Sequence, residues 1–173
     1  MFLIDGHLDL SMNALEWNRD LTRPLAEVRQ REAGKTDKKD RGRGVCTFPE
    51  MRRGQIGLCI ATQIARYVAK DNPLPGWHAP EIAWAQTQGQ LAWYRAMEDR
   101  GQMVQIRDKA GLAQHVALWQ NPLPLGEGGD RRSPGEGLPI GYVLSLEGAD
   151  SIVELSYLER SYAVWNSRGR KPS

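Results

Sequence analysis

Two residues near the start of the chain have side chains that can bind a metal ion together. His7 and Asp9 stand two positions apart in the segment DGHLD, residues 5–9. On an extended chain, side chains at this spacing point to the same side. An imidazole nitrogen and a carboxylate oxygen are both ligands that divalent cations accept. The His-x-Asp pattern alone fits a structural histidine, hydrogen-bonded near its aspartate, equally well.

Glu147 is the third candidate ligand, because it ends another predicted parallel strand. The carboxyl ends of parallel strands meet at one edge of a sheet, where ligands bind in α/β folds and barrels. Two carboxylates about 4 Å apart repel each other by about 4 kcal/mol at an effective dielectric of about 20, and a cation would remove that repulsion. With two oxygens, Glu147 can also bridge two metal ions as a catalytic carboxylate. The alternative is that Glu147 caps a helix following Gly148.

Strands and helices alternate along the chain and predict the scaffold for these residues. Short apolar runs predict strands at residues 1–5, 55–64, 103–106 and 141–146, and helical patterns cover 80–100, 109–119 and the stretch from 151 to 165. This alternation is typical of βαβ units with a parallel sheet, which is an α/β fold. In the helix predicted at 80–100, the apolar stripe expected to face the core consists of Ile82, Ala85, Gly89, Ala92, Trp93, Ala96 and Met97.

The remaining candidates for chemistry have simpler interpretations. His78 precedes a helix and is expected in a loop, and His115 lies inside a predicted helix, where it is expected to be a packing or surface residue rather than a ligand. Cys46 and Cys59 lack the spacing of a zinc site, and no GxSxG segment indicates a serine nucleophile. The charged stretch 29–44 and the Gly- and Pro-rich stretch 121–138 predict surface loops.

Composition excludes several classes of protein. The 173 residues are 40% hydrophobic and 25% charged, which is typical of a globular protein. No apolar run approaches the roughly 18 residues that cross a bilayer, so we expect no membrane partner. A net charge of +2 gives no field that favours nucleic acid as a partner. With two cysteines and no N-terminal leader pattern, the sequence predicts a cytoplasmic protein.

Three segments, in this order, resemble the membrane (renal) dipeptidase family of zinc metallopeptidases. They are DGHLDL at 5–10, PEMRRGQIG at 49–57 and LSLEGAD at 144–150. The resemblance covers residues 1–165 and implies an amidohydrolase-type (β/α)8 TIM barrel with two zinc ions at its C-terminal mouth and a dipeptide as substrate. By this resemblance, His7 and Asp9 bind the first zinc ion and Glu147 bridges both.

Length sets a limit on this interpretation. A complete barrel of this type takes about 250 residues, and the family's second metal site needs two histidines later in the chain, whereas no histidine follows His115. We therefore expect a truncated, incomplete barrel of the first three to four βα units in residues 1–165, followed by a non-family basic tail, 166–173. At most one zinc ion should be held well.

Two functions are consistent with this expectation. One is a zinc-dependent dipeptidase that is weakly active or inactive as this chain. The other is a non-catalytic fragment or binding module that keeps a single-metal remnant. In either case, the unpaired edges of an open barrel sheet predict a homodimer or other self-association.

Overall fold

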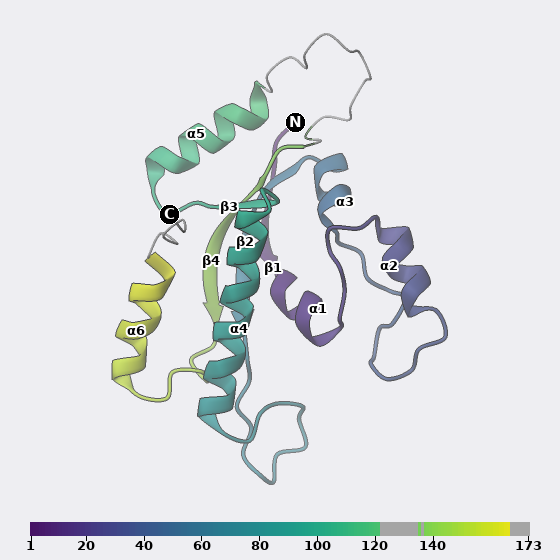
Figure 1. Ribbon diagram of the computed structural model, residues 1–173. Helices are drawn as coiled ribbons and strands as arrows, with labels where there is room; N and C mark the ends of the chain where they lie inside the picture. Colours follow the sequence, from purple (N-terminus) through teal and green to yellow (C-terminus); the bar gives the residue numbers. More distant parts are fainter. Residues whose placement is uncertain (122–134, 136, 167–173) are drawn as a thin grey trace.

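The computed structural model describes residues 1–121, 135 and 137–166. A helix follows each strand, as the sequence predicts, but the segment between the first two strands forms three helices (Figure 1). The strands are β1 (Leu3–Leu8), β2 (Ile56–Ile64), β3 (Met103–Gln105) and β4 (Ile140–Glu147). The helices are α1 (Leu10–Glu16), α2 (Leu25–Glu32), α3 (Phe48–Arg53), α4 (Pro80–Asp99), α5 (Lys109–Gln120) and α6 (Leu155–Asn166). The first strand extends three residues beyond its predicted end, because Leu8 still pairs with Ala61 of β2.

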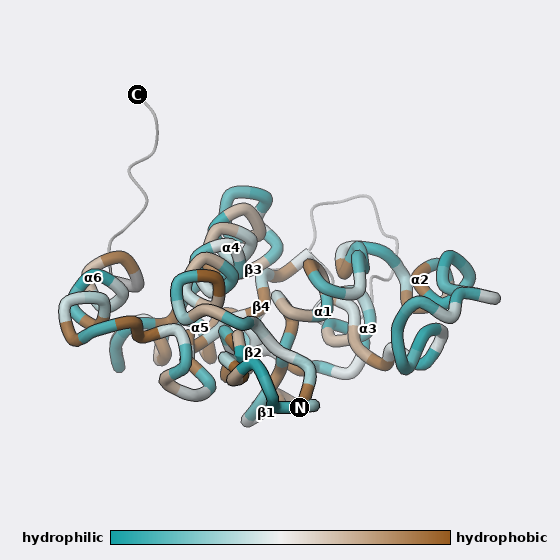
Figure 2. The backbone as a smooth tube through the Cα atoms, turned by 90° about the horizontal axis from the view of Figure 1, so that it is seen from below, coloured by the Kyte–Doolittle hydropathy of each residue, from teal (hydrophilic) through white to brown (hydrophobic). Residues whose placement is uncertain are grey.

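All strand pairs are parallel, and the order in the sheet is β1-β2-β4-β3. Strand β3 pairs only with the first part of β4, from Met103 opposite Ile140 to Gln105 opposite Tyr142. The three longer strands, β1, β2 and β4, therefore lie side by side in the order in which they occur along the chain. The short β3 pairs with β4 at the edge of the sheet. Helix α4 lies along the sheet, as Figures 1 and 2 both show, and contacts β2 and β3.

The core lies between the sheet and its helices, and its centre is aromatic. Tyr94 of α4 stacks on Tyr142 of β4 with ring centroids 5.1 Å apart, and both side chains are fully buried. Burial of two such rings contributes a large part of the apolar surface removed from water.

The predicted buried face of α4 is wrong at most positions. The buried residues are Ala83, Thr87, Gln90, Leu91, Tyr94 and Met97, so that Met97 alone of the predicted stripe is buried, while Trp93 is partly buried and packs against the core. The structure shows why polar residues are buried here: the amide of Gln90 bonds both backbone groups of Ile64, each at 2.7 Å, and the Tyr94 hydroxyl donates to Thr62 O at 2.9 Å. Backbone groups buried at the end of a strand need such partners, and this need outweighs the hydrophobicity of the other face.

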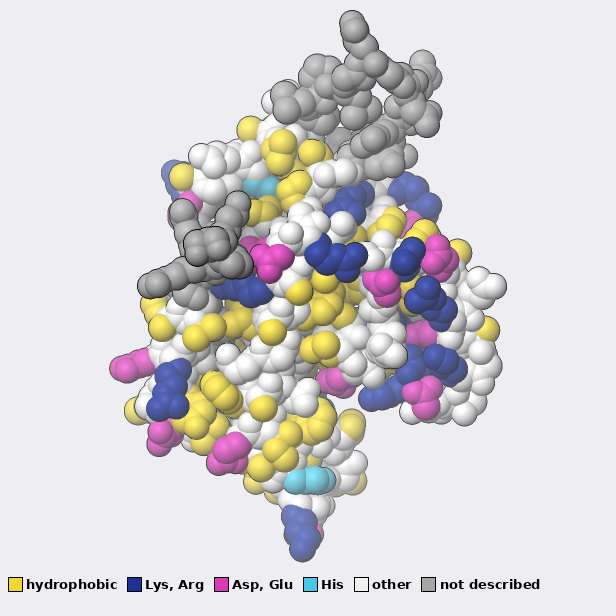
Figure 3. All heavy atoms as spheres, viewed as in Figure 1, with side chains coloured by type: hydrophobic (Ala, Val, Ile, Leu, Met, Phe, Trp, Pro, Cys, Tyr) yellow, Lys and Arg dark blue, Asp and Glu magenta, His cyan; other side chains and the backbone are white. Residues whose placement is uncertain are grey.

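The charged stretch 29–44 is not solvated throughout, contrary to the prediction. Helix α2 occupies its start, and the last residue of that helix, Glu32, is 4% exposed because it pairs with arginines. Charges of both signs are mixed on the surface over α2 (Figure 3).

His115 is a packing residue, as predicted. Its Nε2 lies 2.7 Å from Gly57 O and 3.1 Å from the Gly141 backbone nitrogen, between β2 and β4. Among the helices that the structure describes, none combines the length and the apolar character that crossing a membrane requires. The predicted loop at 121–138 lies mostly outside the described residues, as does the predicted tail beyond Asn166.

Candidate metal centre

An irregularity at the end of β1 sets the direction of His7. Asp5 pairs with Cys59 and Leu8 with Ala61, so three steps along β1 match two steps along β2. Such a bulge turns a side chain away from the direction that strict alternation would give it. After this bulge, the His7 ring lies within contact distance of Glu147.

Asp9 joins β1 to α1 and directs its carboxylate away from the helix. It occupies the N-cap position of α1, where an aspartate normally accepts a hydrogen bond from a backbone N–H of the first turn, but its side chain makes no such bond. The carboxylate instead accepts a hydrogen bond from the Thr62 hydroxyl and lies 3.4 Å from His7 Nε2. The Ser11 backbone nitrogen of the first turn faces the Tyr94 hydroxyl at 3.4 Å. The Asp9 carboxylate is thus available to a ligand.

Glu147 is the last residue of β4 and lies in register with Ile64, the last residue of β2. Its Oε2 lies 3.2 Å from His7 Nε2. The next residue, Gly148, has a φ of +80°, a conformation that glycine adopts without strain, and this allows the chain to turn at once. The alternative that Glu147 caps the following helix is wrong, because α6 begins only at Leu155.

The three side chains form a compact cluster of metal-ligand atoms. One nitrogen of His7 and one oxygen each of Asp9 and Glu147 lie within 4.8 Å of one another. A tetrahedrally coordinated ion with ligand bonds of about 2.0–2.2 Å holds its ligand atoms roughly 3.3–3.6 Å apart. The distances from His7 Nε2 to Glu147 Oε2, 3.2 Å, and to Asp9 Oδ1, 3.4 Å, are close to this separation. One imidazole and two carboxylates suit a divalent transition metal, and with neutral His7 they offer it two negative charges.

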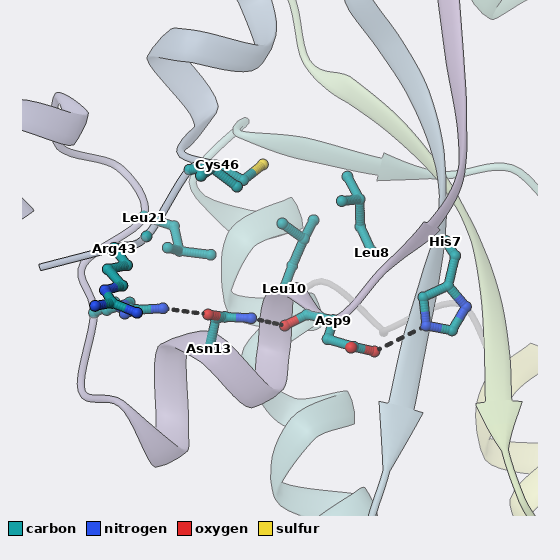
Figure 4. A pocket seen from close by; sticks show the side chains of 11 residues that line it. His7, Leu8, Asp9, Leu10, Asn13, Leu21, Arg43 and Cys46 are labelled. Atoms are coloured by element: carbon teal, nitrogen blue, oxygen red, sulfur yellow. Dashed lines mark hydrogen bonds and ion pairs between the residues drawn. The ribbon is translucent and has the colours of Figure 1, made fainter. Parts of the chain in front are cut away.

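The cluster is accessible from outside the protein and borders a pocket. The exposed fractions of the side chains are 56% for His7, 27% for Asp9 and 42% for Glu147. The adjoining pocket has a volume of about 300 Å³ (Figure 4). Its walls come from the end of β1, from α1, from the segment between α1 and α2 and from the segment that precedes α3. They include His7, Leu8, Asp9, Leu10, Asn13, Arg19, Leu21, Arg43, Gly44, Val45 and Cys46. A small substrate can therefore reach the ligand atoms.

All three ligands predicted from the sequence thus come together. His78 and His115 do not belong to the cluster, as predicted, and neither do the two cysteines. Burial raises the pKa of the Cys46 thiol to about 11, so that it stays protonated near neutral pH. Sequence reasoning missed Thr62, which bonds Asp9 from 53 residues away, and no motif at Thr62 indicates this contact.

The fold and the cluster define an α/β protein with the architecture of part of a TIM-type barrel, which confirms the predicted fold class. The chain is similar to a solved structure described as dipeptidase AC, a metallopeptidase of family M19, with a TM-score of 0.52 and 17% sequence identity. The similarity covers 93% of this chain and 40% of that chain, so this chain spans well under half of its length. No protein-family model matches the chain, and no curated protein matches it in sequence. At this identity the similarity shows the fold alone.

Proposed function

We propose that this chain is the N-terminal part of a zinc-dependent dipeptidase of the membrane dipeptidase family, with His7, Asp9 and Glu147 as ligands of a zinc ion. The observation that carries the proposal is the convergence of these three ligand atoms at the carboxyl edge of a parallel sheet. The structural neighbour, whose description names it a dipeptidase and a metallopeptidase, supports this choice of reaction.

Each ligand has a distinct part in this proposal. Bound at the cluster, a divalent cation would polarise an amide carbonyl and activate water. His7 presents Nε2 to the two carboxylates and must keep that nitrogen unprotonated to bind. Asp9 is oriented by the Thr62 hydroxyl. Glu147 faces His7 with Oε2, and its second oxygen can contact a second ion or take up a proton from the attacking water.

The residues present favour one ion rather than two. The described part of the chain contains one group of three or more metal-ligating side chains, and the other two histidines lie outside it. We therefore propose at most one well-held zinc ion and weak or no turnover by this chain alone. The same observation favours the alternative function, a non-catalytic module that binds a single metal ion.

Metal stoichiometry tests the site, and hydrolysis separates the two functions. Zinc titration by calorimetry, with elemental analysis, should give one ion per chain, and two tightly bound ions or none would contradict the proposal. Hydrolysis of alanyl-alanine at high protein concentration that disappears in Glu147→Gln supports the enzyme. Zinc binding without turnover supports the binding module. Glu154→Gln is the matched control, since Glu154 is an exposed acid that bonds Ser156 and lies outside the cluster.

We also propose that the chain associates with itself through its sheet edge. Among the described residues, β1 pairs with β2 on one side only, and its Leu3 and Ile4 side chains are 39% and 59% exposed. An open edge with apolar side chains favours pairing with another chain.

Both cysteines are free, which supports a reducing compartment such as the cytoplasm.

A further inference from the structure

A buried ion pair lies next to the metal-ligand cluster. The guanidinium of Arg19 donates from Nε to Glu32 Oε1 at 2.8 Å and from Nη2 to Glu32 Oε2 at 3.1 Å. The two residues are 8% and 4% exposed. This two-bonded geometry fixes the plane of the guanidinium more firmly than a single contact would.

Asn13 connects this ion pair to Asp9. Its Oδ1 accepts a hydrogen bond of 2.6 Å from Arg19 Nη1, and its Nδ2 donates to the Asp9 backbone carbonyl at 2.9 Å. Figure 4 shows the part of this series that runs from Asn13 to Asp9 and from the Asp9 carboxylate to His7. The backbone N–H of Asn13 donates to the same carbonyl at 3.0 Å. The carbonyl of a candidate metal ligand is therefore held by two donors.

The chemistry of Arg19 determines which way the Asn13 amide points. A guanidinium donates hydrogen bonds and accepts none. The oxygen of Asn13 must therefore face Arg19, which leaves its NH2 group for the Asp9 carbonyl. The Asp9 carbonyl, which only accepts, requires the same orientation, so Arg19 and Asp9 together hold the Asn13 amide in one position.

The position of the Asp9 backbone matters because its side chain has given up the normal capping bond. At the junction of a strand and a helix, its φ of −85° and ψ of 53° direct the carboxylate toward His7 and Thr62 rather than into the first turn of α1. A metal site requires its ligand atoms to be placed within about 0.5 Å, which depends on the residues that support them.

We propose that Asn13, oriented by the Arg19–Glu32 pair, is a positioning residue for Asp9, and that this network sets the affinity of the cluster for a divalent cation. The inference rests on the proposed metal site. The network also reaches the wall of the adjoining pocket, because Glu32 Oε2 accepts from the Gly42 backbone N–H at 2.8 Å and Arg19 donates to Asp40 O at 3.1 Å. The segment that carries Arg43 and Gly44 is thereby held by the same ion pair that orients the ligand.

The test is cation binding by Asn13→Ala. Alanine suits the helix that contains this partly buried position, so the fold should persist. Loss of a group that orients a metal ligand typically lowers affinity about 10- to 100-fold, and we expect this loss for Zn²⁺, measured by competition with a chromophoric chelator. We also expect an altered visible absorption spectrum of bound Co²⁺, which reports ligand geometry. The control variant Gln88→Ala removes an amide from α4 at a position outside the cluster, and it should change neither the Zn²⁺ affinity nor the Co²⁺ spectrum.

A second variant keeps the inference testable if Asn13→Ala is unstable. Arg19→Lys retains the charge but cannot donate to Asn13 and to both oxygens of Glu32 in one plane, and we expect a similar change in the Co²⁺ spectrum. Thermal unfolding of the metal-free proteins is recorded in parallel.

The outcomes separate this inference from the proposed function. Wild-type protein that binds neither Zn²⁺ nor Co²⁺ contradicts the proposed function and the inference together. Wild-type binding with unchanged affinity and spectrum in Asn13→Ala overturns the inference alone. An affinity loss with an unchanged Co²⁺ spectrum, fully matched by lost stability of the metal-free protein, also overturns it, because the role of Asn13 would then be structural.

Discussion

Replacing Glu32 by glutamine should destabilise the protein in a way that depends on pH. The Glu32 carboxylate accepts hydrogen bonds from Arg19 and Arg41 and from the Gly42 backbone N–H. The hydrogen bond from Arg19 is the main reason that the pKa of Glu32 lies at about 2 rather than 4.5, while burial acts in the opposite direction. Glutamine keeps the shape of the side chain but loses the charge and turns an N–H group toward the guanidinium.

The shift gives the size and the sign of the expected effect. The difference between a pKa of 4.5 and one of about 2 corresponds to about 3 kcal/mol, and because Glu32 is buried we expect a loss of about this size at neutral pH. Because the pKa is lower in the folded protein, the stabilisation is complete above the unfolded value of 4.5 and is lost as the pH falls toward about 2. The difference between wild type and Glu32→Gln should therefore be full at neutral pH and fall by more than half at a pH of about 3.

Urea unfolding followed by far-ultraviolet circular dichroism, at several values between neutral pH and about pH 3, measures this difference. Glu27→Gln on the same helix is the control, and since no ion pair of Glu27 occurs among the described residues, it should change the unfolding free energy by less than about 0.5 kcal/mol. A difference that stays constant with pH would refute the reasoning, because it would show that the loss of stability does not come from the ionised carboxylate. Asp37, which also pairs with Arg41, titrates in both proteins and cancels in the comparison.

Three further predictions concern packing, reactivity and association. In Gly57→Ala, the new β-carbon would overlap the ring of Phe2, so denaturant unfolding should show an unfolding free energy lower by about 1–3 kcal/mol. The control Gly89→Ala has open space at its β-carbon and should lose no stability. Equal stabilities of the two variants would contradict the packing described. Desolvation raises the pKa of the partly buried Cys46 to about 11, so iodoacetamide at about pH 8 should modify Cys46 more slowly in the native protein than in the unfolded protein. Mass spectrometry measures the two rates, and equal rates would contradict the raised pKa. Ile4→Lys places a charge at the exposed position on β1 and should lower self-association in sedimentation velocity, whereas unchanged association would exclude this edge as the contact.

Local sequence patterns predicted most elements well because their causes are local. The helix expected at 80–100 is observed at Pro80–Asp99, with proline at its start and Gly101 in the left-handed region after its end. The strand expected at 55–64 is observed at Ile56–Ile64. The buried face of α4 was not predictable in this way. It is set by Gln90 and Tyr94, whose partners on β2 lie 26 and 32 residues away, and hydropathy does not measure such a bond.

The sequence by itself determined the types of the candidate ligands and their place at the ends of parallel strands. The spacing of His7 and Asp9 and the strand that ends at Glu147 are properties of short segments, and they suffice to predict an edge where the three meet. Only the tertiary structure decided how they meet. Between Asp5 and Leu8, β1 advances three residues for two of β2, and this shift belongs to the pairing of the two strands. The Asp9 carboxylate turns from its helix because Thr62 of β2 offers it a hydrogen bond. The Asp9 backbone is held because Glu32, 13 residues after Arg19, orients the guanidinium that directs Asn13. The pairing of β1 with β2, the contact of Asp9 with Thr62 and that of Arg19 with Glu32 join segments that only folding brings together, so no local pattern carries a signal for them.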